Sequence, residues 1–170
     1  MLASELFKLI EKKVPPNLAV DNDKIGYFGV EDPYKLEINK VQVLLDLLPD
    51  HDPTNSGADL VICHHPPLYQ PEFPIYVIHS NWDVVRGGAN DALAESLKLE
   101  VLDVLDKKTG IGRICYTSTT MKDFIKRITN SLPAHHINMI NCPSQKIIER
   151  VGLVAGFGLK NPEYIKLAHE

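Results

Sequence analysis

Apolar residues recur along the chain with two different periods, and each period predicts a different kind of element. In residues 1–14 they recur every three to four positions, which predicts an amphipathic helix that ends at Pro15–Pro16. The same period predicts helices over residues 90–99, after Thr120 and after Asn161. Thr120 and Asn161 are residue types that cap helix N-termini, so these helices are expected to begin there.

Short runs with a period of two, or with apolar residues only, predict strands between these helices. Residues 40–46 alternate, and residues 59–63 are apolar throughout after Asp59, which is typical of a strand buried in a parallel sheet. The other predicted strands are residues 25–30, 75–78, 100–105, 113–116, 136–141 and 147–155. Alternation of strands and helices with short loops predicts an α/β fold, with a mixed or mostly parallel sheet flanked by helices.

Length and the end of the sequence refine this picture. A chain of 170 residues is the size of one domain, so we expect a single α/β domain over residues 1–170. The helix after Asn161 has no capping signal at its end, and the sequence stops inside an apolar pattern. We therefore expect this domain to lack its C-terminal part.

Composition restricts the class of protein. Hydrophobic residues make up 44% and charged residues 24%, as in an ordinary globular protein, and a net charge of -4 argues against a surface built for nucleic acid. No apolar run reaches the roughly 18 residues that a membrane span needs, so no membrane partner is expected. The three cysteines are widely spaced and form no CxxC pair, which argues against a zinc ribbon or a disulfide scaffold. Together with an N-terminus unlike a signal peptide, this predicts a cytoplasmic protein.

Coordinating chemistry is concentrated around two adjacent histidines. His64 and His65 follow the apolar strand directly, and ligands bind at this edge of open α/β sheets. Asp83 comes eighteen residues after His65, and we expect the two imidazoles to serve two neighbouring metal ions while Asp83 supplies a carboxylate oxygen. Imidazole and carboxylate ligands suit zinc, iron, manganese, cobalt or nickel and do not choose among them. His79, four residues before Asp83, is expected either to bind metal or to orient a ligand.

Other residues with coordinating or anion-binding chemistry favour structural interpretations. Cys63 is expected to point into the core by strand alternation. The second pair, His135 and His136, is expected to be an ordinary loop pair. The glycine turn at residues 156–158 is expected to be a tight turn, although it also has the form of an anion cradle at a helix start.

Three motifs, taken together at their spacing, resemble one known family. They are the HHP motif at residues 64–66, the HxxxD motif at residues 79–83 and the GGxND motif at residues 87–91. The chain resembles the Nif-three-like dinuclear-metal family, whose members are also called GTP cyclohydrolase I type 2 homologues. The resemblance covers nearly the whole chain.

This resemblance implies a two-metal centre in a cytoplasmic homo-oligomer, usually a hexamer. It implies that His64 and His65 bind the two metal ions, that Asp83 binds one of them, and that His79 lies close by. The family completes its centre with a later histidine and a bridging glutamate in an HxxxE-type motif. The adjacent His169 and Glu170 do not match that motif, so we expect these ligands to be missing from the chain.

Two hypotheses for function remain open. The first is a metal-dependent hydrolase acting on a nucleotide or on another phosphorylated or cyclic-amidine molecule, in which His64, His65 and Asp83 are ligands and no general base is assigned. The second is a metal-binding oligomeric scaffold or a regulatory protein that contacts nucleic acid and catalyses no reaction.

Overall fold

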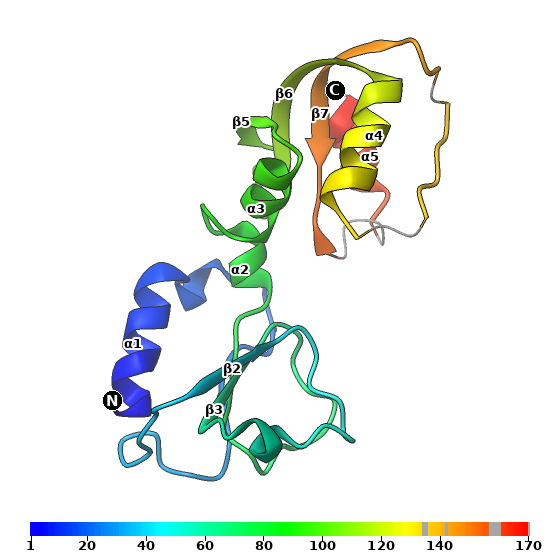
Figure 1. Cartoon of the computed structure of the whole chain (residues 1–170). Helices are drawn as coiled ribbons and strands as arrows, with labels where there is room; N and C mark the ends of the chain where they lie inside the picture. Colours follow the sequence, from blue (N-terminus) through cyan, green and yellow to red (C-terminus); the bar gives the residue numbers. More distant parts are fainter. Residues whose placement is uncertain (134–135, 142, 157–160, 170) are drawn as a thin grey trace. The chain divides into compact units, whose positions relative to one another are not determined.

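The computed structural model describes residues 1–133, 136–141, 143–156 and 161–169, and the chain divides into two compact units, Met1–Val85 and Arg86–Glu170 (Figure 1). Each unit has its own sheet and its own buried side chains. The predicted α/β class with a mixed sheet is confirmed, whereas the expectation of one domain lacking its C-terminal part stays a prediction. The residues of interest that lie outside the described ranges are His135, Cys142, Phe157, Gly158 and Glu170.

The first unit contains a four-stranded mixed sheet and the helices around it. Its elements in chain order are α1 (Ala3–Lys13), η1 (Pro16–Leu18), β1 (Gly26–Phe28), β2 (Val41–Leu44), η2 (Pro53–Ser56), β3 (Leu60–Cys63), β4 (Ile75–Val77) and α2 (Ser80–Val84). The strand order is β1-β4-β3-β2. Strands β2, β3 and β4 are parallel, and β1 runs antiparallel to β4.

Apolar side chains on both faces of β3 form the core of this unit. Leu60 belongs to the cluster that includes α1, where Phe7 packs on Tyr76 with ring centroids 4.4 Å apart. Val61 and Cys63 belong to the cluster on the other face. All three β3 side chains are fully buried, which confirms the predicted buried parallel strand and the inward position of Cys63.

The register of the parallel strands brings their carboxyl ends to one edge of the sheet. Leu44, the last residue of β2, pairs with Cys63, and Cys63 pairs with Val77, the last residue of β4. The segments that follow the three strands therefore begin side by side, at the edge where open α/β sheets bind ligands.

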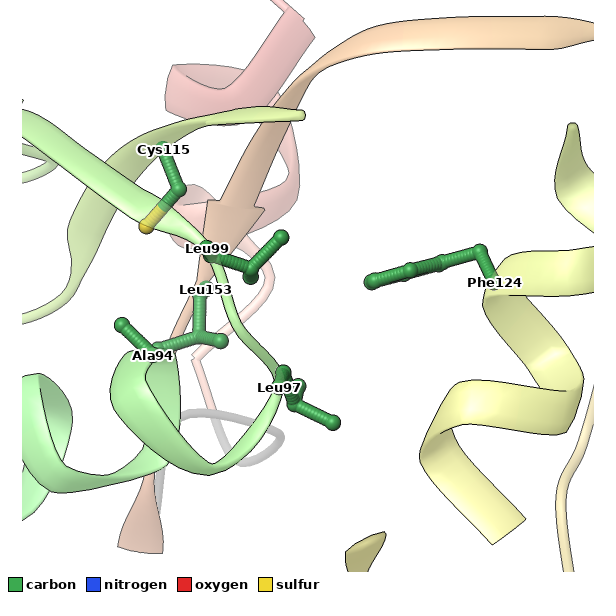
Figure 2. Close-up of a cluster of buried hydrophobic side chains, with 6 residues drawn as sticks. All are labelled: Ala94, Leu97, Leu99, Cys115, Phe124 and Leu153. Carbon is green, nitrogen blue, oxygen red and sulfur yellow. The ribbon is translucent and has the colours of Figure 1, made fainter. Parts of the chain in front are cut away.

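The second unit contains an antiparallel sheet in the order β5-β6-β7 together with the helices α3, α4 and α5. Its elements are α3 (Ala89–Ser96), β5 (Glu100–Val104), β6 (Arg113–Thr120), α4 (Met121–Ser131), β7 (Ile147–Leu153) and α5 (Glu163–His169). Figure 2 shows its core, in which Phe124 points from α4 toward Leu99, the residue before β5. The other side chains of this cluster are Ala94, Leu97, Cys115 and Leu153.

Polar residues of the GGxND motif tie α3 to this sheet. Asn90 is fully buried, and its Oδ1 accepts a hydrogen bond of 2.8 Å from the backbone N–H of Ala155, just beyond β7. Asp91 forms an ion pair with Arg113 on β6, which is only 4% exposed. The motif therefore has a structural role in this unit.

Most predicted elements are confirmed with small shifts at their ends. Both predicted caps are present, since Thr120 Oγ1 accepts from the N–H of Asp123 and Asn161 Oδ1 accepts from that of Glu163. The strand predicted over residues 136–141 is wrong, because those residues form no strand. Ile140 is 85% exposed there and has no core to pack on, so its apolar character misled the prediction. Within the described part of the chain, no helix combines the length and the apolar character needed to cross a bilayer.

Candidate metal centre

Three histidines converge at the carboxyl edge of the parallel strands in the first unit. His64 and His65 follow β3 directly, and His79 follows β4 two residues later. The ring centroids are 4.9 Å apart for His64 and His65, 5.1 Å for His64 and His79, and 5.7 Å for His65 and His79. One ring nitrogen of each lies within 4.8 Å of the other two, so the three imidazoles are close enough to hold a metal ion.

Asp83 joins this cluster from α2. Its backbone N–H donates to the carbonyl oxygen of His79, so the HxxxD spacing corresponds to one helical turn and brings both side chains to the same side. Asp83 is only 4% exposed, and its Oδ1 lies 3.8 Å from Nε2 of His64. The sequence-predicted set of His64, His65 and Asp83 is thus brought together, although the structure does not test metal binding itself.

The Nδ1 atom of each imidazole is already engaged. Nδ1 of His64 donates to the carbonyl oxygen of Ile78 at 2.9 Å, since a carbonyl can only accept. Nδ1 of His65 lies 2.7 Å from a carboxylate oxygen of Asp46. This arrangement leaves Nε2 as the nitrogen with a free lone pair, and it is the arrangement in which histidines bind metals in proteins.

His79 is held in the same way by a carboxylate from far away in the sequence. Its Nδ1 lies 2.8 Å from Oδ1 of Asp23, and the other oxygen of Asp23 accepts hydrogen bonds from the backbone N–H and hydroxyl of Ser80. Burial of Asp23 opposes ionisation, but the hydrogen bonds from Ser80 and His79 outweigh it and lower the pKa of the carboxyl. Asp23 is therefore an ionised acceptor that fixes the orientation of His79.

Burial determines the protonation of the inner residues. It lowers the pKa of the His64 imidazole despite the hydrogen bond to Ile78, and so favours the neutral form that binds metals. It also raises the pKa of the Asp83 carboxyl, although the three neighbouring imidazoles act in the opposite direction. A buried carboxyl group beside three imidazoles is a donor set that fits a divalent cation.

Side chains at residues 79–83 (HSNWD) connect this arrangement to the N-terminal part of the unit through hydrogen bonds. The backbone N–H of Val20 donates to the Ser80 hydroxyl at 3.0 Å. Asn81 is buried, accepts from the N–H of His79 at 3.0 Å and donates to the carbonyl oxygen of Val14 at 3.3 Å. The position of His79 is therefore set by hydrogen bonds between residues 56 to 67 positions apart in sequence.

The sequence predicted the four residues His64, His65, His79 and Asp83 but not the two carboxylates that support them. Asp46 carried a usable signal, because it is the last residue of the strand predicted over residues 40–46, and the carboxyl ends of strands in one sheet are where ligands bind. Asp23 carried none, since it lies 56 residues before its partner His79. Of the second histidine pair, His136 is exposed and His135 lies outside the described residues.

Comparison with known proteins identifies the family of the chain. A family model described as Duf34/NIF3 (NGG1p interacting factor 3) matches residues 72–169. A protein of Methanothermobacter thermautotrophicus named GTP cyclohydrolase 1 type 2 homolog is 39% identical over 163 residues, which are 96% of this chain and 66% of that protein. A protein of the same name from Methanocaldococcus jannaschii is 28% identical and is matched over 94% of this chain and 72% of its own length.

Solved structures extend the similarity to the fold. Reduced HcgD from Methanocaldococcus jannaschii is 27% identical with a TM-score of 0.64, over 76% of this chain and 60% of that one. A Bacillus cereus protein related to NIF3 is 18% identical with a TM-score of 0.81, over 96% of this chain and 79% of that one, which shows a common fold. The chain thus spans slightly less than two-thirds of the length of the first curated relative and of HcgD.

Proposed function

The chain belongs to the Duf34/NIF3 family, and on this premise we propose that it binds two divalent metal ions through His64, His65 and Asp83 and that the whole protein is a metal-dependent hydrolase. One observation carries the proposal: three imidazoles with engaged Nδ1 atoms converge within 4.8 Å beside a buried carboxylate. We include His79 as a third nitrogen ligand on the same geometry.

The surroundings of each residue suit this role. His64 and Asp83 hold the centre from its buried side, with side chains 17% and 5% exposed. The His65 side chain is 45% exposed and faces solvent, so a substrate would arrive on its side of the centre. Nitrogen and oxygen donors together suit zinc, iron, manganese, cobalt or nickel.

The chemistry follows from this ligand set. Two bound divalent ions would supply Lewis acidity and a water acidified enough to attack at neutral pH. His64, His65 and Asp83 act as ligands and not as proton-transfer groups. The proposed substrate is a nucleotide or another phosphorylated or cyclic-amidine molecule, which the name shared by the curated relatives supports.

We also propose a cytoplasmic homo-oligomer, with a hexamer as the expected state. The support is the family membership. Light scattering on the purified full chain measures the oligomeric state directly, and a monomer at all concentrations would contradict this part of the proposal.

Elemental analysis of the purified protein tests metal binding first. We expect stoichiometric transition metal in the native chain and a large loss in the double variant His64→Ala, His65→Ala. His51→Ala is a matched control, because His51 is an exposed histidine of the same unit outside the cluster. Equal metal content in the native chain and the double variant would overturn the proposed centre.

Turnover of a nucleotide panel by the metal-loaded chain then separates the two functional hypotheses. Hydrolysis by the native chain and the His51→Ala control, but not by the double variant, supports the hydrolase. Stoichiometric metal without turnover of any panel member favours the second candidate, a metal-binding scaffold. The family description as an interacting factor is the observation that keeps this candidate in view.

A further inference from the structure

A polar cavity of about 620 Å³ lies within the second unit, between the end of α4 and the start of β5. Side chains from three elements line it, and two of them, Lys98 and Arg127, are cations. Tyr116, Thr117 and Ser118 on β6, each of which carries a hydroxyl group, form another part of its wall. A cavity of this volume is within the range that proteins use for small molecules.

Arg127 is fixed in place by the surrounding backbone and side chains. One of its terminal nitrogens donates to the carbonyl oxygen of Leu97 at 3.3 Å and to the hydroxyl of Thr117 at 3.2 Å. Its guanidinium carbon lies 5.9 Å from the ring centroid of Phe124, the side chain that Figure 2 shows in the core. The planar group is thereby held at the cavity, and a held guanidinium is well suited to bind oxyanions through paired N–H groups.

Lys98 occupies a backbone conformation that normally favours glycine. Its φ is 52°, so it adopts the left-handed conformation just after the end of α3. The backbone N–H of Lys98 donates to the carbonyl oxygen of Glu95, and the N–H of Leu99 donates to that of Ala94, which closes the helix. A lysine at such a position brings an ammonium group to the cavity wall at the cost of backbone strain. Neither Lys98 nor Arg127 forms an ion pair with a carboxylate among the described residues.

The strand that forms the cavity wall is irregular at this point. The register between β6 and β7 shifts between Tyr116 and Thr119, so Thr117 and Ser118 fall within the irregularity. Such irregularities re-aim side chains and are common beside binding sites. Glu100 also lines the cavity and adds an acceptor for ligand hydroxyl groups.

We propose that this cavity binds a small phosphorylated molecule that carries hydroxyl groups, such as a sugar phosphate. Lys98 and Arg127 bind the phosphate, and Glu100 accepts hydrogen bonds from the hydroxyls. A small molecule fits better than a nucleic acid because the two cations lie in one open pocket of small-molecule size and the whole chain has a net charge of -4. The inference goes beyond the proposed metal centre, all of whose residues belong to the first unit.

Calorimetric titration of the full chain tests the proposal with ribose 5-phosphate, inorganic phosphate and unphosphorylated ribose as probes. All titrations contain EDTA, so that phosphate bound to metal makes no contribution and the outcome is independent of the metal centre. We expect ribose 5-phosphate to bind more tightly than inorganic phosphate, and ribose not to bind. Loss of either cation should weaken the ribose 5-phosphate complex by about tenfold or more, which is the loss expected when a charged hydrogen bond is removed.

The variants are Arg127→Gln, Lys98→Gln and Lys98→Gly, with Lys126→Gln as the matched control. Lys126 is the neighbouring exposed cation on α4, pairs with Asp123 and does not line the cavity. Lys98→Gly keeps the left-handed backbone accessible, so a folded variant is assured even where Arg127→Gln disturbs packing. Unchanged affinity in both Lys98 variants would overturn the proposal.

Two other outcomes would also overturn it. The first is the absence of binding by every phosphorylated probe at millimolar concentration. The second is binding of a single-stranded RNA oligonucleotide by the native chain, lost in Lys98→Gln, without binding of ribose 5-phosphate. That result would assign the same cations to a macromolecule.

Discussion

At the scale of single residues, the carboxylates behind the histidines are as informative as the histidines themselves. Asp46 contacts His65, and Asp23 contacts His79, each through Nδ1. Such contacts fix the ring orientation and raise the basicity of the nitrogen that faces the metal. The affinity of the proposed centre should therefore depend on residues that never touch the metal.

Replacement of Asp46 tests this dependence without disturbing the core. Asp46→Ala should weaken zinc binding by about 10- to 100-fold, because His65 loses the carboxylate that orients it. A competition titration against a chromogenic chelator measures the effect. Asp50→Ala, an exposed carboxylate in the following loop, is the control, and equal affinities in both variants would contradict a role for Asp46.

The lowered pKa of Asp23 predicts a pH dependence of stability. Because the folded pKa lies below the unfolded value of about 3.9, the ionised carboxylate stabilises the fold above that pH and the contribution is lost as pH falls through the folded value. In metal-free urea denaturation, the loss of unfolding free energy in Asp23→Asn should be largest near neutral pH and shrink below about pH 4. A loss that does not change with pH, or an equal loss in the exposed control Asp21→Asn, would contradict this.

At the scale of elements, polar residues connect helices to sheets in both units. In the second unit, Asp91 at the start of α3 forms an ion pair with Arg113 on β6. Burial of Asp91 opposes ionisation, but the hydrogen bond and the charge of Arg113 lower the pKa of its carboxyl. The pair therefore holds α3 against the sheet in its ionised form.

Replacement of Asp91 should destabilise the second unit strongly. Asp91→Asn leaves the buried Arg113 without its carboxylate, and the unfolding free energy should fall by about 3 kcal/mol. Urea denaturation monitored in this unit measures the loss. The control is Asp103→Asn, which removes the exposed pair with Lys107 and should have no measurable effect.

Local patterns were sufficient to predict most elements and the inner part of the centre. The apolar run before His64 predicted a buried parallel strand, and the edge rule for parallel sheets then placed His64, His65 and Asp83 near one another. The partners of His79 were beyond such reasoning, because hydrogen bonds between residues 56 positions apart leave no periodic signal. The wrong strand prediction at residues 136–141 has the opposite cause. A local apolar pattern is present there, but its large apolar side chains Met139 and Ile140 are exposed and do not pack in a core.

At the scale of the whole molecule, the proposed metal ligands all belong to one of the two units. Every residue of the centre, from Asp23 to Asp83, lies within Met1–Val85. A bound metal should therefore stabilise the first unit directly, since binding to the folded state alone adds free energy to that state.

Hydrogen exchange with and without metal measures this selectivity. At a free metal concentration of about one hundred times Kd, the first unit should gain about 2.7 kcal/mol, so exchange of the most protected amides of β3 and β4 slows by about two orders of magnitude. The amides of β6 should be unchanged. Equal slowing in β6, or slowing in the double variant His64→Ala, His65→Ala, would contradict a centre confined to the first unit.

The position of the centre within the chain also has a consequence for synthesis. Ribosomes add residues from the N-terminus, and domains generally fold as units in that order. Once Asp83 has emerged, the nascent chain already contains His64, His65, His79 and both supporting carboxylates, while Arg86 onward is still to come. On the proposed ligand set, metal capture by these residues would therefore precede the emergence of the second unit from the ribosome and would assist the folding of the first.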